Sequence, residues 1–456
     1  MSLLQPRPDV YCCTAAVSAH AKGRRWQLSL SVLSQMPEIR VRPNVVSYNA
    51  AISGQGWQLA LSLLGRMPRV RVTPDAISYN TAMSTCERAG QWQTACSLLR
   101  EMVDKEVAPD AISYSAAISA CEKASMWQVA LSLLRQMPQG SAMPNRISYG
   151  AAMSACEKGG MWQLVLSLLS EMPKVNLMPD AINYNAAISA SSGQSELALA
   201  LLAQMSEARV PPTAVSYNAA ISACEKRGEW QIALGVLDQM AAVKAIPDVI
   251  GFSAAISACE SGCQPQAAVS ILSAMPAARV IPNVVSFSAA ISACEKGGEW
   301  KLSLCLLARM FSERVVPNRI SYDAAISSCE KGRRWQLSLE LFNDMIKVHV
   351  PRNSVTHRAT VIACCQQRQW VLGLSLFEAM SLANLDTGAQ ACGALIAACD
   401  GAGAWLRAMT FLRDIEASAS EKVAAMAHSH RSETAARGEP RREGPSLILL
   451  ARSSSG

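Results

Sequence analysis

Charged and aromatic residues are scarce in this 456-residue chain. Charged residues make up 17% of it and aromatic residues 5%, whereas half of all residues are apolar. This composition excludes a chain that is disordered overall, because enough apolar surface is present for a large core. No apolar run approaches the ~20 residues that a helix needs to cross a bilayer, so we expect no membrane contact. The net charge of +7 permits an anionic partner without requiring one.

Sequence motifs that carry chemistry are also missing. The chain has no GxxxxGK phosphate loop, and none of its five histidines begins the H-x-E motif of zinc deaminases. Among the 16 cysteines, Cys259 and Cys263 are close in sequence but lack a second pair or a suitable histidine for a zinc site. We therefore predict no catalytic residue, no metal, no cofactor and no small-molecule substrate.

The two ends of the chain differ from the rest. The opening MSLLQPRPDV lacks the features of a signal peptide and of a transit helix. The stretch SLLQPRPD resembles the end of a repeat, which predicts a truncated remnant over residues 1–9 and a missing native start. The period described below is lost over residues 417–456, where Ala, Ser, Arg and Glu predominate, so we predict a disordered tail there.

One pattern is written about twelve times between these ends. Trp92, Trp127 and Trp162 lie 35 residues apart, and a series of cysteines that includes Cys86 and Cys121 keeps the same spacing. Each unit contains two helical patterns, such as ISYGAAMSACEK and WQLVLSLLSEM, and ends with Pro-Asp or Pro-Asn. No strand pattern occurs. We predict an all-α fold, a right-handed α-solenoid of helix-turn-helix repeats over residues 10–416.

The repeat boundaries follow the Pro-Asp and Pro-Asn pairs. The units are 10–44, 45–75, 76–110, 111–145, 146–180, 181–213, 214–248, 249–283, 284–318, 319–353, 354–388 and a partial unit, 389–416. Units 45–75 and 181–213 are short: the first lacks the ACEK segment, which is about one helical turn, and the second lacks two residues near its inner turn.

A helical wheel separates two faces of the first helix when each unit is numbered from its first residue. Positions 4, 7, 8 and 11, such as Tyr79, Ala82, Met83 and Cys86, predict a stripe buried against the unit's own second helix. Positions 2, 5, 9, 12 and 13 fall on the opposite side and are expected to be exposed. The recurring cysteines are predicted to be buried free thiols, and the tryptophans to serve packing rather than base stacking.

Position 2 carries a β-branched residue on this otherwise polar face. It is Val46, Ile77, Ile112, Ile147, Ile182, Val215, Ile250 or Val285 in successive units. Two interpretations remain open: an edge contact with the preceding unit, or a row of wedges for something flat.

Two further positions vary only among small or hydrogen-bonding residues. Position 5 is Thr14, Asn49, Asn80, Ser115, Gly150, Asn185, Asn218, Ser253 or Ser288. The closing residue is Asn44, Asp75, Asp110, Asn145, Asp180, Asp248, Asn283 or Asn318. Asp and Asn after Pro are good helix N-caps, which explains the closing residue structurally but does not explain the variation.

The 35-residue period, the SYNAAIS opening and the closing PD or PN resemble the pentatricopeptide repeat family, in a Trp-rich variant. The resemblance covers residues 10 to about 416. The tetratricopeptide family differs, because its period is 34 residues and its Trp opens the first helix.

The resemblance implies single-stranded RNA as the partner, with one base per repeat. It implies that position 5 and the closing residue read the base and that position 2 sandwiches it. Asp only accepts hydrogen bonds and suits uracil or guanine, whereas Asn can donate to adenine or cytosine, and a small position 5 leaves room for a purine. The units in order then predict 5′-A-U-U-A-G-N-U-A-A-3′. The pairs that do not fit are Asn185/Thr213, Asp323/Asn353 and Arg358/Gly388.

Lysine recurs at position 13 as Lys123, Lys158, Lys226 and Lys296. The resemblance implies that these residues lie near RNA phosphates. Alternatively, they only complement the C-terminal end of the first helix.

The sequence as a whole predicts a non-catalytic, sequence-preferring RNA-binding protein. By resemblance alone, it would support RNA processing, stabilisation or translation in a mitochondrion or plastid. The alternatives are a protein-binding scaffold of the tetratricopeptide kind and a degenerate array with little specificity.

Overall fold

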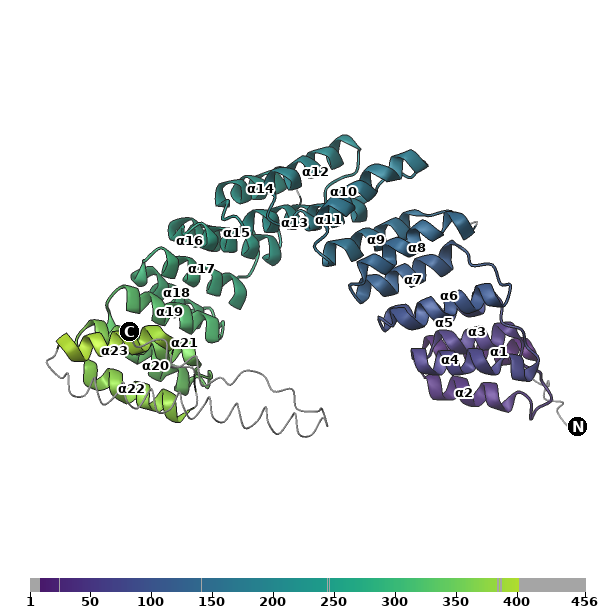
Figure 1. Cartoon of the computed structure of the whole chain (residues 1–456), viewed down its shortest axis with the longest axis horizontal. Helices are drawn as coiled ribbons and strands as arrows, with labels where there is room; N and C mark the ends of the chain where they lie inside the picture. Colours follow the sequence, from purple (N-terminus) through teal and green to yellow (C-terminus); the bar gives the residue numbers. More distant parts are fainter. Residues whose placement is uncertain are drawn as a thin grey trace, which may run out of the picture. The chain divides into compact units, whose positions relative to one another are not determined.

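The fold is helical throughout the part of the chain that the structure describes. The computed structural model describes residues 9–401 except 24, 141, 244, 246, 384, 386 and 387. Its regular structure consists of 23 α-helices and three short 3-10 helices (Figure 1). The predicted all-α solenoid is confirmed. Apart from Asp9, the predicted remnant over 1–9 lies outside the described residues, as do the predicted tail over 417–456 and the end of the array over 402–416.

First and second helices of the repeats alternate along the chain. The first helices are α1 (Val10–Lys22), α3 (Val45–Ser53), α5 (Ala76–Arg88), α7 (Ala111–Lys123), α9 (Arg146–Lys158), α11 (Ala181–Ala190), α13 (Ala214–Glu225), α15 (Val249–Ser261), α17 (Val284–Lys296), α19 (Arg319–Lys331), α21 (Ser354–Gln366) and α23 (Gly388–Gly401). The second helices are α2 (Trp26–Gln35), α4 (Trp57–Arg66), α6 (Trp92–Asp104), α8 (Trp127–Gln136), α10 (Trp162–Glu171), α12 (Ser195–Glu207), α14 (Trp230–Ala242), α16 (Pro265–Ala274), α18 (Trp300–Ser312), α20 (Trp335–Lys347) and α22 (Trp370–Leu382). The 3-10 helices are η1 (Pro68–Val70), η2 (Pro138–Gly140) and η3 (Met172–Val175).

The chain forms two compact units, one ending at Gly297 and one beginning at Gly298. In the first unit, neighbouring first helices from α1 to α17 pack side by side, as α7 and α9 do in Figure 1. Each second helix there packs on its own first helix and on the first helix of the next repeat. In the second unit, α19, α21 and α23 stack in the same way, and α20 and α22 each contact two of them. Within each unit the first helices therefore form one continuous layer.

The closing residue of each repeat starts the next first helix. The Asp110 carboxylate accepts from the backbone N–H of Ser113 at 2.8 Å, and the Ser113 hydroxyl accepts from the backbone N–H of Asp110 at 3.2 Å. This reciprocal capping box satisfies N–H groups that have no partner inside the helix. The first helix of unit 45–75 lacks about one turn, as predicted, since α3 has 9 residues against 13 in α7. The first helix of unit 181–213, α11, is also short, with 10 residues.

The predicted core stripe is confirmed. Tyr79, Ala82, Met83 and Cys86 are fully buried, and the cysteines in the described residues are free thiols. Burial raises the pKa of the Cys156 thiol to about 11, so this thiol stays protonated at neutral pH. The recurring cysteines therefore act as small apolar core residues.

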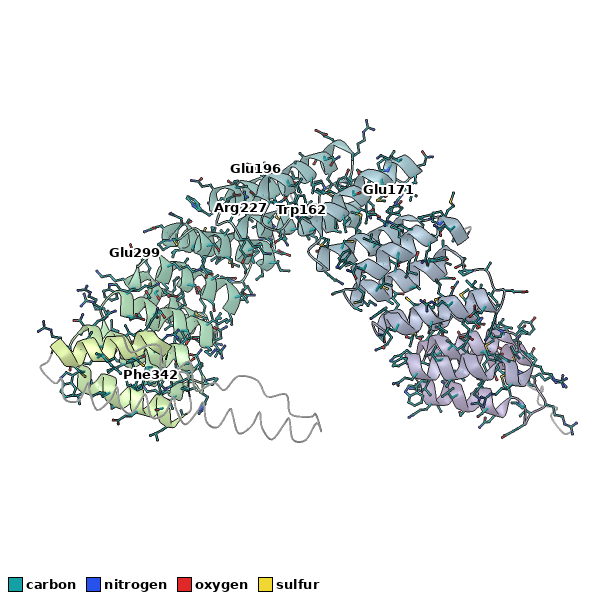
Figure 2. The ribbon with its side chains drawn as sticks, viewed as in Figure 1. Trp162, Glu171, Glu196, Arg227, Glu299 and Phe342 are labelled. Carbon is teal, nitrogen blue, oxygen red and sulfur yellow. The ribbon has the colours of Figure 1, made fainter. Side chains whose placement is uncertain are left out.

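The tryptophans pack between repeats. Each tryptophan in the described residues opens a second helix, as Trp162 opens α10 (Figure 2), and most of them are half-buried. A Cβ added at Gly159, where α9 ends, would lie 2.5 Å from the Trp127 ring of the preceding repeat. The pairs Trp230/Gly262 and Trp300/Gly332 repeat this approach. The packing role predicted for tryptophan is confirmed, and glycine at position 14 is explained by the ring that covers it.

We expect Gly159→Ala to lower the free energy of unfolding by about 1–3 kcal/mol, because the added Cβ displaces the Trp127 ring. Gly235→Ala is the matched control, since no atom lies within 4 Å of a Cβ added there. It should be neutral or stabilising by up to about 1 kcal/mol, through helix propensity. Urea unfolding followed by circular dichroism measures both, and equal midpoints for Gly159→Ala and the unaltered chain would contradict the packing argument.

Candidate nucleic-acid interface

The position-2 side chains are exposed along the first-helix layer. In the first unit the residues from Val46 to Val285 at this position keep 59–67% of their surface exposed. An edge contact with the preceding repeat accounts only for the smaller part of each side chain. Position 2 therefore forms a row of exposed β-branched side chains along the first helices.

The expectation that position 5 lies on an exposed face is wrong. Asn80, Ser115 and Asn218 are buried, although each is polar. The cause is the side-by-side packing of first helices, which turns position 5 toward the first helix of the next repeat. Gly150, Ser253 and Ser288 are buried as well, whereas Thr14, Asn49 and Asn185 are half-buried.

Position 5 nevertheless meets the closing residue of its own repeat. The Asn80 Nδ2 donates to Asp110 at 3.1 Å to Oδ1 and 3.2 Å to Oδ2. The Asn218 Nδ2 donates to Asp248 Oδ1 at 2.9 Å. Longer contacts of 3.4 Å join Asn49 to Asp75 and Ser115 to Asn145.

The remaining predicted pairs are arranged differently. In the described residues, no side-chain hydrogen bond joins the two members of Thr14/Asn44, Gly150/Asp180, Asn185/Thr213 or Ser253/Asn283. Ser288 lies on α17 in the first unit, whereas Asn318 caps α19 in the second.

The charge of the closing aspartate is secured by its hydrogen bonds. Partial burial acts to raise the pKa of Asp110, but hydrogen bonds from Ser113 and Asn80 outweigh it and hold the pKa below its usual value. The same balance lowers the pKa of Asp75. Both carboxylates are therefore ionised at neutral pH and act only as acceptors.

A hollow of about 460 Å³ brings the predicted positions together. Ile77 and Ile112 at position 2, Asn80 at position 5 and the closing Asp110 all line it, with Arg88 at position 13. The other lining residues are Ser53, Thr81 and Ser84. Its volume lies in the range of sites that hold small planar molecules, roughly 300–1,000 Å³.

The position-13 lysines have partners that the sequence reasoning missed. The Lys158 Nζ lies 3.1 Å from Oε1 of Glu122, which is position 12 of the preceding repeat. The equivalent distances are 2.9 Å for Lys296 to Glu260 and 4.0 Å for Lys123 to Glu87. The signal was a glutamate at position 12 of one unit followed by a lysine at position 13 of the next.

Lys226 is the exception among the predicted lysines. The preceding unit, 181–213, is short and lacks the position-12 glutamate. Within the described residues, no ion pair joins Lys226 to an acidic side chain.

Family models of the repeat match most of the array. The pentatricopeptide repeat domain model matches residues 4–57, 167–227, 235–298 and 270–331. The PPR repeat model matches 112–140, 147–177, 215–242 and 320–350, and the PPR repeat family model matches 74–123. The chain belongs to the pentatricopeptide repeat family.

Solved structures with a similar course of the chain include other pentatricopeptide repeat proteins. The protein PPR10 from maize is 17% identical, with 90% of this chain and 74% of that chain covered and a TM-score of 0.44. Its complex with an 18-nucleotide psaJ RNA element covers 91% and 80% at 15% identity and a TM-score of 0.37. Yeast Rmd9p in complex with a 16-nucleotide target RNA covers 90% and 86% at 10% identity and a TM-score of 0.34. A comparison with curated proteins gave no match.

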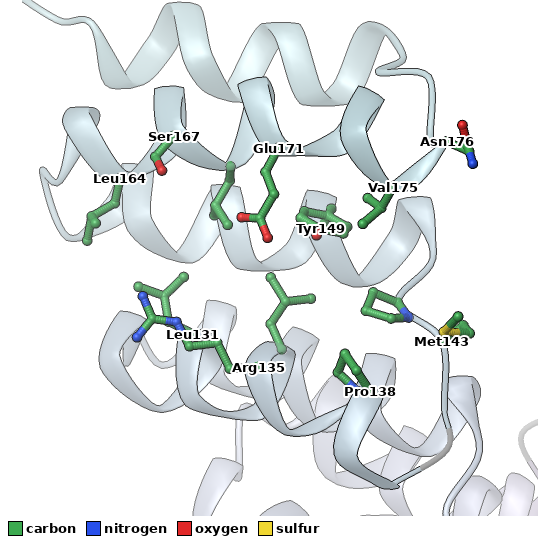
Figure 3. Close-up of a pocket in the computed structure, with 13 residues that line it drawn as sticks. Leu131, Arg135, Pro138, Met143, Tyr149, Leu164, Ser167, Glu171, Val175 and Asn176 are labelled. Atoms are coloured by element: carbon green, nitrogen blue, oxygen red, sulfur yellow. The ribbon is translucent and has the colours of Figure 1, made fainter.

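A second hollow, of about 590 Å³, lies between two second helices of this pentatricopeptide repeat protein. Figure 3 shows Leu131 and Arg135 of α8 on one side and Ser167 and Glu171 of α10 on the other. It contains no residue from positions 2, 5 or 13 and no closing residue, so it is separate from the candidate interface.

No helix in the described part of the chain has the length and apolar character to cross a membrane.

We expect Asp110→Ala to lower the free energy of unfolding of this pentatricopeptide repeat protein by about 1 kcal/mol, because the cap of α7 is lost. Asp110→Asn keeps a cap and removes only the charge. Since the folded pKa of Asp110 is depressed, the contribution of the charge is complete above the unfolded pKa of about 3.9 and is lost as pH falls through the folded pKa.

Thermal unfolding between pH 7 and pH 3 checks this expectation. The stability difference between the unaltered chain and Asp110→Asn should shrink below about pH 4. A difference that is independent of pH would contradict the assigned cause of the pKa shift.

Proposed function

We propose that this protein binds single-stranded RNA with a sequence preference, one base per repeat, and catalyses no reaction. The observation that carries the proposal is the hollow formed by Ile77, Ile112, Asn80 and Asp110. It combines two exposed apolar walls with a polar floor whose hydrogen-bonding groups differ between repeats.

The two walls suit a flat, partly apolar ring. Ile77 and Ile112 belong to adjacent repeats, and each keeps about 60% of its surface exposed. A base between them would bury apolar surface of both side chains without any rearrangement of the first-helix layer. Removal of such surface from water contributes about 25 cal/mol per Å².

The floor offers a defined hydrogen-bonding edge. The Asn80 Oδ1 accepts from Ser113 and one amide N–H is held by Asp110, so a single amide N–H remains. Beside it, the ionised Asp110 supplies an acceptor. A donor next to an acceptor complements the O4 and ring N–H of uracil.

The next repeat presents a different edge. Ser115 is shorter than asparagine, and the closing residue is the neutral Asn145, whose amide can donate. More room and a donor in place of the carboxylate favour adenine. This difference between neighbouring repeats supports a preference near 5′-A-U-U-A-G-N-U-A-A-3′.

Phosphate contact by the position-13 lysines is compatible with their ion pairs. Lys158 and Glu122 form an exposed pair, and exposed pairs contribute only about 0–1 kcal/mol. A phosphate could therefore replace the glutamate at little cost. We further propose, from family membership alone, that the protein acts in a mitochondrion or plastid on RNA processing, stabilisation or translation.

The central test compares 5′-AUUAGAUAA-3′ with a scrambled RNA of the same composition, by fluorescence anisotropy at fixed ionic strength. We expect at least tenfold tighter binding of the ordered sequence, because each well-formed base contact discriminates by about 1–3 kcal/mol. Asp110→Asn is the matched variant, since it preserves the helix cap and exchanges an acceptor for a donor. It should shift the preference at the third base from uracil to cytosine.

The possible outcomes separate the alternatives. Equal affinity for both RNAs would identify a degenerate array and overturn the base preference. Absence of RNA binding would overturn the proposed function and favour the protein-binding scaffold.

The walls are tested by Ile112→Ala. We expect about threefold to tenfold weaker RNA binding, because the variant removes apolar contact with the base. Val103→Ala is the control, since Val103 on α6 is equally exposed, at 59% against 60% for Ile112, but lies on a second helix. If the two variants bind RNA equally well, position 2 is not a wall of the base site.

A further inference from the structure

A hydrogen bond links position 5 of one repeat to position 3 of the next. The Ser113 hydroxyl lies 2.6 Å from Asn80 Oδ1 and 2.9 Å from Asp110 Oδ1, and its single proton is donated to the nearer oxygen, that of Asn80. The same contact recurs at 2.6–2.8 Å in the pairs Thr14/Ser47, Asn185/Ser216 and Ser253/Ser286. The position-3 side chain is fully buried, so it cannot touch RNA itself.

In two further repeats the side chains at these positions have complementary sizes. Where position 5 is Gly150, the following position 3 is the larger Asn183, whose Nδ2 lies 3.4 Å from the point where a Cβ of Gly150 would be. Where position 5 is Asn218, the following position 3 is Gly251. A Cβ at Gly251 would lie 2.5 Å from Asn218 Oδ1, so Asn218 occupies the space that a serine side chain fills elsewhere.

This exchange leaves Asn218 incompletely bonded. Its Nδ2 still donates to Asp248, but its Oδ1 is buried and has no hydrogen-bond partner within the described residues. Asn80/Asp110 and Asn218/Asp248 are therefore the same pair of residue types, but the two asparagine side chains are held by different hydrogen bonds. The amide of Asn80 is held at both ends, and that of Asn218 is held at one.

We propose that the position-3 residue of the following repeat is a positioning residue for base reading, an inference that rests on the proposed function. Because Ser113 binds the Asn80 carbonyl oxygen, the remaining amide N–H is the group that this side chain offers to a base. The unpartnered carbonyl of Asn218 can instead turn toward a donor such as the amino group of cytosine, because an unsatisfied buried acceptor is unfavourable. The repeat 214–248 should therefore separate uracil from cytosine less well than the repeat 76–110.

The chain supplies a control that separates reading from helix capping. The Ser78 hydroxyl accepts from the Asp75 N–H and donates to its Oδ1 at 2.8 Å, so Ser78 completes a capping box as Ser113 does. It makes no hydrogen bond to Asn49, the position-5 residue of the preceding repeat, whose Oδ1 is unpartnered. Ser78→Ala thus removes a cap contact without changing the support of a reading residue.

The test measures affinities of the full chain for 5′-AUUAGAUAA-3′ and for RNAs with cytosine at the second, third or seventh base. We expect Ser113→Ala to lower the uracil-to-cytosine affinity ratio at the third base by about fivefold, the effect of about one lost hydrogen bond. The ratio at the seventh base should not change. Ser78→Ala should leave the ratio at the second base unchanged, while thermal unfolding shows a similar loss of stability for both variants.

The opposite change, addition of a position-3 hydroxyl where it is missing, is made at Gly251. Gly251→Ser should raise the ratio at the seventh base, and Gly251→Ala, which fills the same space without a hydroxyl, should not. The displaced Asn218 Oδ1 is the end of a flexible side chain, so both variants can be accommodated.

Failure of this inference differs from failure of the proposed function. If the ordered RNA is preferred and the ratios at the third and seventh bases do not respond to these variants, only the positioning role is overturned. If the ordered RNA is not preferred over the scrambled one, the proposed function and this inference are overturned together.

Discussion

The N-cap of each first helix is the interaction on which the rest of the array depends. The closing Asp or Asn binds the third N–H of the next first helix, which fixes where that helix begins and how its neighbours stack beside it. Asp and Asn cap a helix about equally well. Both residues therefore supply the cap at the helix, while the group that they present away from the helix changes from an acceptor to a donor. The cap leaves this choice free to specify a base.

Side-by-side packing of first helices imposes the second constraint. It buries position 5 and commits most of its hydrogen-bonding capacity inside the protein, as the bonds of Asn80 to Asp110 and Ser113 demonstrate. A bound base could form hydrogen bonds only with the donors and acceptors of position 5 that have no partner inside the protein. Under the proposed function, base recognition would therefore depend on these internal bonds as much as on exposed groups, and a side chain out of reach of RNA would be able to alter it.

The sequence was sufficient for the period, the caps, the core stripe and the exposed row at position 2, because each is local to one helix or one turn. It was insufficient for position 5 and Lys158, whose neighbours belong to another repeat. A wheel drawn for one helix cannot show that position 5 faces position 3 of the next helix, or that Lys158 reaches back to Glu122. The exchange of large and small residues in Gly150/Asn183 and Asn218/Gly251 was visible in the sequence, but it has meaning only once those positions are known to touch.

Packing by the second helices allows the array to tolerate substitutions in the first helices. Spacing between repeats is set by contacts such as Trp127 on Gly159, at the opposite end of the first helix from the cap. Substitutions at the exposed position 2, and exchanges of Asp and Asn at the closing residue, therefore leave these contacts in place. The side chains at position 5 and at position 3 of the next repeat take part both in the proposed base recognition and in the packing of neighbouring first helices. In Gly150/Asn183 and Asn218/Gly251 a change of size on one side of this pair accompanies the opposite change on the other, so the neighbouring helix limits which side chains fit at position 5.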